Sequence, residues 1–312
     1  IMNILITGGA GFIGSHLTDT LLRSGNRVIC VDNFELGTRD NLKEVLKRAD
    51  FFLAEGTAAD ADFLSEIMQK YQIEMVYHMA ANSDIQKSAA SPDIDFVNTF
   101  STTYGVLEAM RRSGVKKLFF ASTSAVYGEK MGKKLTEDIG ELSPISYYGG
   151  AKLASEAFIS SYSYMNDFDV TIFRFPNVIG PRLTHGVIFD FIKKLQENPA
   201  KLQILGDGTQ EKPYIYVLDL VDAIVKVSQS GAQGVHVYNI GVESATTVIE
   251  IADMVCRKMN LKNVEYSFTG GNRGWKGDVP KFQYDLTKIH KWGWYPSHTS
   301  NEAVEATLEH VL

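Results

Sequence analysis

The chain has 312 residues, of which 45% are hydrophobic and 22% are charged, so it can bury a large core as one large or two modest domains. A net charge of −6 without a long basic run argues against a nucleic-acid surface, and no apolar run approaches the roughly 18 residues of a membrane span. The opening apolar run leads directly into a glycine turn, unlike a signal peptide. We therefore expect a cytoplasmic protein that binds neither nucleic acid nor membrane, with Cys30 and Cys256 reduced.

A glycine-rich turn lies between the first predicted strand and the first predicted helix. The apolar run that begins at Asn3 meets residues 8–14, which fit both G-x-G-x-x-G and G-x-x-G-x-x-G. Glycine lets the backbone approach a dinucleotide pyrophosphate, and the helix N-terminus offers free N–H groups and a partial positive charge. The sequence therefore predicts a dinucleotide site made by Gly8, Gly11, Phe12, Ile13 and Gly14.

A single acidic residue indicates which dinucleotide is bound. The second apolar run, residues 27–31, ends in Asp32, which follows Gly14 at nearly the spacing expected of a ribose-binding acid. A carboxylate there accepts hydrogen bonds from both ribose hydroxyls and repels a 2′-phosphate, so NAD is favoured over NADP. The glycine turn together with Asp32 disfavours the alternative, a strand–turn–helix unit that binds no ligand.

Apolar strands alternate with helical patterns through the first half of the chain. Further strands are predicted at 51–54, 75–79, 117–121 and 170–174, with helices near 60–70, 93–113 and 147–166. Such alternation is typical of an α/β fold of the Rossmann type, a doubly wound parallel sheet with helices on both faces. Ligands bind at the carboxyl ends of its strands, where we expect a cluster of Gly8, Asp32, His78, Thr123 and Arg174.

The pattern changes after residue 175. Helices near 186–197, 219–230 and 245–260 are mixed with short strands and glycine turns. We therefore expect an NAD-binding domain at 1–175, which also holds the catalytic residues, and a smaller C-terminal α/β substrate lobe at 176–312. Some segments of that lobe are expected to return to the first sheet, and the cleft between the lobes is the expected substrate site.

Two hydroxyl-bearing segments predict the chemistry. Tyr148 and Lys152 are four residues apart on a predicted helix, so the ammonium lies near the phenol and is expected to lower its pKa. Thr123 follows a predicted strand, between Ser122 and Ser124, and can hydrogen-bond the substrate oxygen that the tyrosine deprotonates. Beside a bound nicotinamide, these groups suit hydride transfer at an alcohol carbon.

These motifs together resemble one family over essentially the whole chain. The matching segments are residues 7–14, 31–33, 78–81, 98, 122–128, 148–152, 174–182 and 214–219. They are similar to the extended short-chain dehydrogenases/reductases, specifically the NAD-dependent nucleotide-sugar epimerase/dehydratase group. The resemblance implies NAD as cofactor, a nucleotide-diphosphate sugar as substrate, and a homodimer.

The resemblance also implies a role for individual residues. Tyr148 would be the general base and acid, Lys152 would tune it and hold the nicotinamide ribose, and Thr123 would be the catalytic hydroxyl. Further cofactor contacts are implied for Asn33, Ala80, Asn98 and Ser122. Substrate contacts are implied for Ser83, Thr123, Ser124, Asn177, Val187, Lys212 and Arg273, with Lys276 as an alternative to Arg273. No cluster has metal-ligand spacing, so no metal is expected.

Departures from the family pattern narrow the reaction. Dehydratases of the family carry an Asp-Glu pair after the catalytic threonine, whereas this chain has Ser124 and Ala125. This favours C4 epimerisation of the UDP-glucose/UDP-galactose type, through a transient 4-keto sugar. Thr57 replaces an aspartate expected to read the adenine, so a 4-ketoreductase or dehydrogenase that releases its cofactor is the alternative. An NAD-binding sensor without activity is disfavoured by the complete catalytic set.

Other residues near these motifs have a plainer interpretation. His78 is expected to be structural, and Tyr127 to pack or to touch the nicotinamide. His185 lies in the loop at 182–187, which the resemblance places near the nucleotide base, and is expected to be a surface loop residue. Asn82 and Asp84 would either face the sugar or cap a turn. The stripe of Phe100, Tyr104, Leu107 and Met110 predicts core or interface positions.

Overall fold

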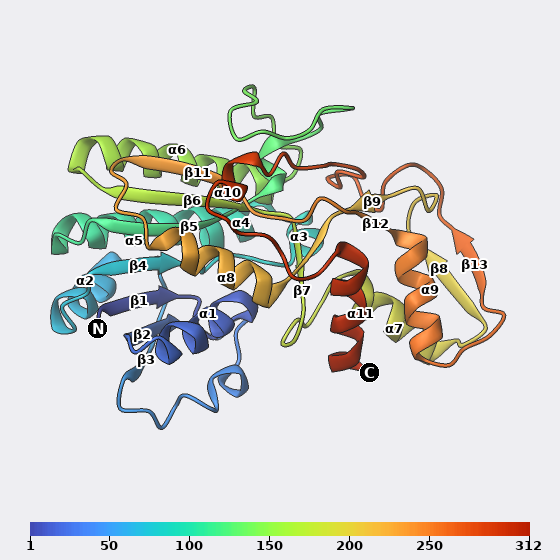
Figure 1. Cartoon of the computed structure of the whole chain (residues 1–312), viewed down its shortest axis with the longest axis horizontal. Coiled ribbons are helices and arrows are strands. Elements are labelled where there is room, and N and C mark those ends of the chain that lie inside the picture. The colour runs from blue at the N-terminus through green and yellow to red at the C-terminus, as the bar shows by residue number, and fades with distance from the viewer.

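The molecule, a computed structural model that describes residues 1–312 except for the side chain of Lys87, is built on a seven-stranded sheet (Figure 1). Every neighbouring pair of strands in this sheet is parallel. Its strands follow the order β11 (Val235–Asn239), β6 (Asp169–Phe175), β5 (Lys117–Thr123), β4 (Met75–His78), β1 (Asn3–Thr7), β2 (Arg27–Asp32) and β3 (Phe51–Glu55). The predicted doubly wound parallel sheet is therefore confirmed.

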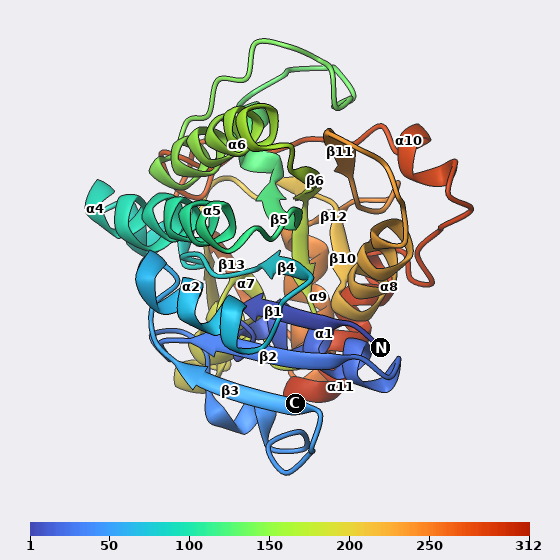
Figure 2. The same ribbon diagram turned by 90° about the vertical axis from the view of Figure 1, so that its left-hand side faces the viewer.

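Both faces of this sheet are buried, because alternate residues of each strand point to opposite sides. Ile4 and Ile6 pack with α1 (Phe12–Arg23) and α8 (Val217–Ser228). Leu5 packs on the other side, which is covered by α2 (Ala61–Lys70), α5 (Thr102–Ser113) and α6 (Tyr147–Asn166). Figure 2 shows these two helical layers on either side of the sheet.

No helix in the described part of the chain has the length and apolarity needed to cross a membrane.

The helix predicted at 93–113 contains a local change of geometry. It begins as α4 (Pro92–Asp95), continues through the π-helical segment η2 (Phe96–Ser101), and leads into α5. Ser91 caps the start by accepting a hydrogen bond from the Asp93 N–H at 3.3 Å. Such π segments are frequent at functional sites, and this one contains Asn98.

A second lobe packs beyond the carboxyl edge of the sheet (Figure 1). Its helices α7 (Val187–Glu197), α9 (Val248–Lys258) and α11 (Ser300–Val311) share one apolar cluster. Three two-stranded sheets complete it: β7 (Asn177–Ile179) with β10 (Tyr214–Tyr216), β8 (Lys201–Ile204) with β13 (Glu265–Phe268), and β9 (Glu211–Lys212) with β12 (Thr246–Thr247). The short elements are η1 (Arg39–Leu42), α3 (Ile85–Ser88), η3 (Ser124–Tyr127) and α10 (Thr287–His290). Strand β11 and helix α8 belong to the second half of the sequence but lie on the large sheet.

Candidate active site

A cavity of about 750 Å³ lies at the carboxyl edge of the large sheet and extends to the second lobe. It is centred on the ends of β1 and β4, where the strand order reverses, which is the usual ligand position in such sheets. Most of the predicted site residues line it, whereas Lys152, Arg273 and the expected cluster members His78 and Arg174 do not. Those that do are Gly8, Gly11, Phe12, Ile13, Gly14, Asp32, Asn33, Ala80, Ser83, Asn98, Ser122, Thr123, Ser124, Tyr148, Asn177, Val187 and Lys212.

The glycine turn forms one end of the cavity, and its geometry excludes side chains. Gly8 has a φ of 70°, and a Cβ there would lie 2.7 Å from the backbone nitrogen of Ala80. A Cβ on Gly14 would overlap the carbonyl oxygen of Gly8. Gly11 occupies the N-cap of α1 and has no side chain to bind the first helical N–H groups. These N–H groups therefore face the cavity, as a pyrophosphate site requires.

Asp32 lies at the end of β2, beside the glycine turn. Its Oδ2 accepts a hydrogen bond from the Ala10 N–H at 2.9 Å, and its Oδ1 accepts one from the Phe34 N–H at 2.8 Å. Burial raises the pKa of the Asp32 carboxyl, while these two backbone donors lower it. A Cβ on Gly37 would lie 2.9 Å from Oδ1, so that backbone approaches the carboxylate closely. The turn and this oriented carboxylate fit the pyrophosphate and ribose of NAD.

Thr123 and Tyr148 meet at the middle of the cavity. Thr123 ends β5, and its Oγ1 accepts a hydrogen bond from the Ala125 N–H at 3.1 Å. Ser146 caps α6 by accepting from the Gly149 N–H at 3.1 Å, which places Tyr148 in the first helical turn. Burial raises the pKa of the Tyr148 phenol, with a smaller contribution from a nearby carboxylate, whereas the nearby Thr123 hydroxyl lowers this pKa. The two hydroxyls therefore lie close together at the cavity.

Lys152 lies beneath this pair rather than in the cavity. Its Nζ donates a hydrogen bond to the Ala121 carbonyl at 2.5 Å and lies 5.9 Å from the centroid of the Tyr148 ring. Burial lowers the pKa of Lys152 to about 7, although Glu156 and Asp95 raise it. The expectation that this ammonium lowers the pKa of Tyr148 is therefore wrong for this structure. The lysine is itself desolvated, so it is only partly charged at neutral pH.

A buried ion pair lies behind Lys152 and Ser122. Glu156, one helical turn after Lys152, accepts a 2.5 Å hydrogen bond from Ser122 Oγ. The guanidinium of Arg174 binds the same carboxylate through two nitrogens at 2.7 and 3.1 Å. Arg174 also donates to the hydroxyl of Tyr127, which is fully buried. Arg174 was expected in the ligand cluster, but its strong pair with Glu156 turns it into the core, and Tyr127 does not line the cavity.

His78 is also turned away from the cavity, although it too was expected in the ligand cluster. Its Nδ1 is 2.6 Å from Thr7 Oγ1, and its Nε2 is 3.0 Å from Thr103 Oγ1. Burial lowers the pKa of His78 to about 3, so the ring is neutral. It ties β4 to β1 and α5, the structural role that its sequence context favoured.

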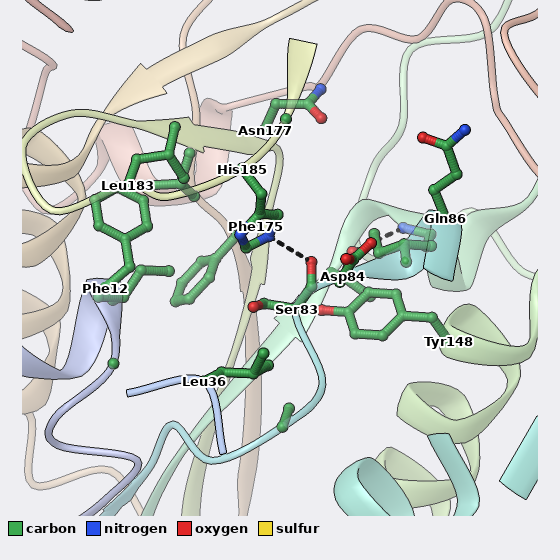
Figure 3. Close-up of a pocket in the computed structure, with 18 of the residues that line it drawn as sticks. Phe12, Leu36, Ser83, Asp84, Gln86, Tyr148, Phe175, Asn177, Leu183 and His185 are labelled. Carbon is green, nitrogen blue, oxygen red and sulfur yellow. Dashed lines mark hydrogen bonds between the residues drawn. The ribbon is translucent and has the colours of Figure 1, made fainter. Parts of the chain in front are cut away.

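Asn82 and Asp84 were expected either to face the sugar or to cap a turn, and they differ in their position. The amide of Asn82 donates to the carboxylate of Asp95 at 3.0 Å and to the Asp84 carbonyl at 3.2 Å. It therefore holds the turn after β4. Asp84 lines the cavity, and Figure 3 shows it beside Ser83 and Tyr148.

The second lobe forms the other end of the cavity, and it supplies charged side chains to the cavity wall. Lys212 lines the wall and is ion-paired with Asp278, which lines it too. Arg273 lies outside the lining because its guanidinium pairs with Glu129 at 2.8 Å. Lys276 is exposed and also lies outside it. A phosphate contact by Arg273 stays a prediction.

Several lining residues were not predicted from the sequence. His185 was expected in a surface loop, yet it lines the cavity, and its Nε2 lies 3.1 Å from the Ser83 carbonyl of the opposite wall (Figure 3). Unpredicted lining residues from other loops and helices include Leu36, Gln86, Phe175, Arg182, Leu183, Gln210, Trp275 and Phe282. Phe175 and Arg182 belong to the matching segment 174–182, and the loop that begins at Arg182 was expected near the nucleotide base, whereas the others come from separate segments without a shared spacing.

Comparison with known proteins identifies the family. The model of the NAD-dependent epimerase/dehydratase family matches residues 4–241. The chain belongs to this family. It is 29% identical to the UDP-glucose 4-epimerase of Mycolicibacterium smegmatis, over 99% of this chain and 98% of that one. It is 30% identical to the dTDP-D-glucose 4,6-dehydratase of Mus musculus, over 98% of this chain and 87% of that one.

A solved structure of the same family agrees with this fold. UDP-glucose 4-epimerase of Thermotoga maritima, solved with UDP-glucose, superposes with a TM-score of 0.88. It is 32% identical and is matched over 99% of this chain and 98% of that one. The chain is therefore an NAD-dependent enzyme of nucleotide-sugar chemistry, in a family that contains both epimerases and dehydratases.

Proposed function

We propose that this chain epimerises a nucleotide-diphosphate sugar at C4, of the UDP-glucose/UDP-galactose type. The observation that carries the proposal is that Thr123 and Tyr148 line the same cavity as the glycine turn, while the two positions after Thr123 bear no carboxylate. These positions, Ser124 and Ala125, both line the cavity. Relatives named as 4-epimerases are consistent with it.

The chain's own residues suit proton transfer at a sugar hydroxyl. Bound NAD would accept a hydride from the sugar carbon and return it, and its cationic ring would favour the phenolate of Tyr148. Tyr148 is positioned to take the proton of the 4-hydroxyl and later to give it back. Thr123, close to the same phenol, is positioned to hold that sugar oxygen. Lys152, with a pKa lowered to about 7 and its Nζ 5.9 Å from the centre of the Tyr148 ring, would hold the nicotinamide ribose beside these hydroxyls.

The positions after Thr123 weigh against dehydration. Elimination of water needs a group that protonates the leaving hydroxyl and a base that removes a carbon-bound proton. A serine hydroxyl and an alanine methyl group at positions 124 and 125 supply neither at neutral pH. Oxidation and reduction at C4 need only the groups described above.

The substrate side is assigned mainly to residues 176–312. Ser83 and Ser124 would contact the sugar from the first lobe, and Asn177 would contact the sugar or its diphosphate. Val187 and Lys212 would contact the nucleotide diphosphate. Lys212 is a point charge and cannot form the two-pronged phosphate contact of an arginine. Its pairing with Asp278 means that a diphosphate would compete with a carboxylate for this ammonium.

The helices α5 and α6 also carry a surface that fits a second copy of the chain. Phe96, Val97, Tyr104 and Phe158 are 42–58% exposed on these helices and the adjoining π segment. Leu107 and Met110 of the predicted stripe are fully buried, so the stripe divides between core and surface. We infer a homodimer that covers this apolar face, and light scattering of the purified protein tests it.

The function is tested by incubating the purified protein with UDP-glucose, UDP-galactose and further sugar nucleotides. We expect interconversion of two C4 epimers without net formation of NADH. A preparation with bound NAD that converts none of them would contradict the proposal.

One observation favours a second candidate, a 4-ketoreductase or dehydrogenase that releases its cofactor. Thr57 lines the cofactor end of the cavity, where a carboxylate would hold an adenine amino group more firmly. Its hydroxyl instead accepts a hydrogen bond from the Ala59 N–H at 3.2 Å. Consumption of NADH in step with substrate would identify this alternative.

A further inference from the structure

The turn that follows β7 contains a strained arginine. The Leu183 N–H bonds the Gly180 carbonyl at 3.3 Å, with Pro181 and Arg182 between them. Arg182 has a φ of 70°, in a position where turns of this kind usually place glycine or asparagine. A strained residue that is not glycine suggests that its side chain has a role.

That side chain attaches the turn to the helix of the glycine-rich site. Arg182 Nη2 donates to Asp19 Oδ2 on α1 at 2.8 Å, and both side chains are mostly buried. One turn nearer the start of α1, His16 Nε2 lies 2.8 Å from the Pro181 carbonyl. Burial lowers the pKa of His16, so the neutral ring can donate this hydrogen bond. Nη1 of Arg182 is buried without a partner among the described residues, a second cost that the pair with Asp19 offsets.

The same segment continues across the cavity to its opposite wall. Residues 182–186 all line the cavity, and α7 begins immediately after them. His185 reaches the Ser83 carbonyl beyond β4, as Figure 3 shows. The glycine turn and Asp32 fit the cofactor, so residues 182–186 form a wall of the remaining space, together with Asn177 and Lys212.

We propose that Arg182 is a positioning residue for the nucleotide diphosphate of the substrate. Its pair with Asp19 fixes residues 180–186 to α1, so the wall of the nucleotide site is in place before the nucleotide binds. A preformed wall raises affinity because less chain has to be ordered on binding. The inference rests on the proposed function and deepens it, since one helix then supports both the cofactor turn and the substrate wall.

The test separates the role of the Arg182 side chain from the strain of the Arg182 backbone. Arg182→Gly removes the guanidinium but suits a positive φ, so relief of backbone strain partly offsets the lost ion pair and we expect the chain to remain folded. Calorimetric titration with UDP, and in parallel with dTDP, should show a Kd raised about tenfold, with NAD content per chain unchanged. Asp19→Asn should raise the Kd similarly, and the double variant no further, because both changes remove one interaction. Arg23→Ala, which removes an exposed arginine of α1, is the matched control and should leave the Kd unchanged.

Several results would overturn this role. They are a nucleotide Kd for Arg182→Gly within twofold of the wild type, additive effects of the two substitutions, or loss of NAD. A wild-type chain that binds neither UDP nor dTDP would overturn it as well. A wild-type chain that binds UDP with the expected variant effects but converts no sugar nucleotide would overturn the proposed function alone, and would support the role of Arg182.

Discussion

The two ends of the cavity are built in different ways. The cofactor end depends on backbone geometry within one strand–turn–helix unit, where Gly8 and Gly14 leave no room for a Cβ. The substrate end depends on side-chain pairs between distant segments, such as Lys212 with Asp278 and Arg182 with Asp19. Tyr148 and Thr123 lie where the two ends meet.

This difference determines what each end tolerates. A backbone site cannot relax around an added methyl group, so single substitutions there remove binding altogether. A site held by several separate ion pairs is expected to lose affinity in steps, because each pair contributes only part of the geometry. The first end therefore fixes the cofactor class, and the second leaves room for variation in the substrate.

The largest effect is expected where the two ends meet. Tyr148→Phe removes the proton donor and acceptor, so kcat should fall by about 10²–10⁴, the usual contribution of general acid–base catalysis. NAD content should be retained, since the glycine turn is untouched. Tyr147→Phe alters the exposed neighbouring phenol and should keep wild-type kcat. Equal losses in both variants would show that the effect is not specific to Tyr148.

Gly14→Ala tests the backbone end. Its Cβ would overlap the Gly8 carbonyl oxygen, so the turn must open, and the amount of NAD that copurifies should fall at least tenfold. Gly150→Ala is the matched change on α6, where a Cβ meets open space. It should preserve NAD content and raise stability by about 0.5–1 kcal/mol through helix propensity. Normal NAD content in Gly14→Ala would refute the backbone account.

Lys212→Met tests the side-chain end. Removing a cation that binds phosphate should weaken UDP binding about 10- to 100-fold, the range of a charge-assisted hydrogen bond. NAD content should not change. Lys276→Met removes a nearby exposed cation outside the cavity and should leave UDP affinity unaltered. If the two variants weaken UDP binding equally, the affinity depends on the net positive charge of this region and not on a contact made by Lys212.

Glu156→Gln gives the smallest expected effect on activity, a shift in pH dependence, although its Tm should fall because the buried Arg174 loses its charged partner. Lys152 has a pKa lowered to about 7, so kcat/KM, which reports the free enzyme, should fall as pH rises through this value. Glu156 raises the pKa of Lys152, so its neutralisation should move this alkaline limb to lower pH. Ser122→Ala removes the hydroxyl bound to Glu156 but keeps its charge, and should leave the limb in place. If the alkaline limb of kcat/KM in Glu156→Gln stays at the wild-type pH, the protonation of Lys152 does not control activity.

The sequence revealed features that depend on local geometry. The alternation of strands and helices predicted the sheet, and the glycine spacing with Asp32 predicted the cofactor wall, because each is contained in a short stretch of chain. It did not reveal that Arg174 turns into the core, since its partner Glu156 lies on another element. The loop of Arg182 and His185 was expected near the nucleotide base, but their contacts with Asp19 and Ser83 were missed for the same reason. The pKa of Tyr148 was misjudged because helical spacing indicates proximity to Lys152 but not the desolvation of both groups.

The central claim is that the chain inverts C4 and reuses its NAD in every turnover. The direct measurement follows purified protein with UDP-galactose and the sugar-nucleotide panel, by NMR of the products and by NADH absorbance. The account predicts that a substrate and its C4 epimer reach equilibrium with no net NADH. A 4-keto-6-deoxy product, which shows loss of water, would contradict it, as would NADH formed or consumed in step with substrate.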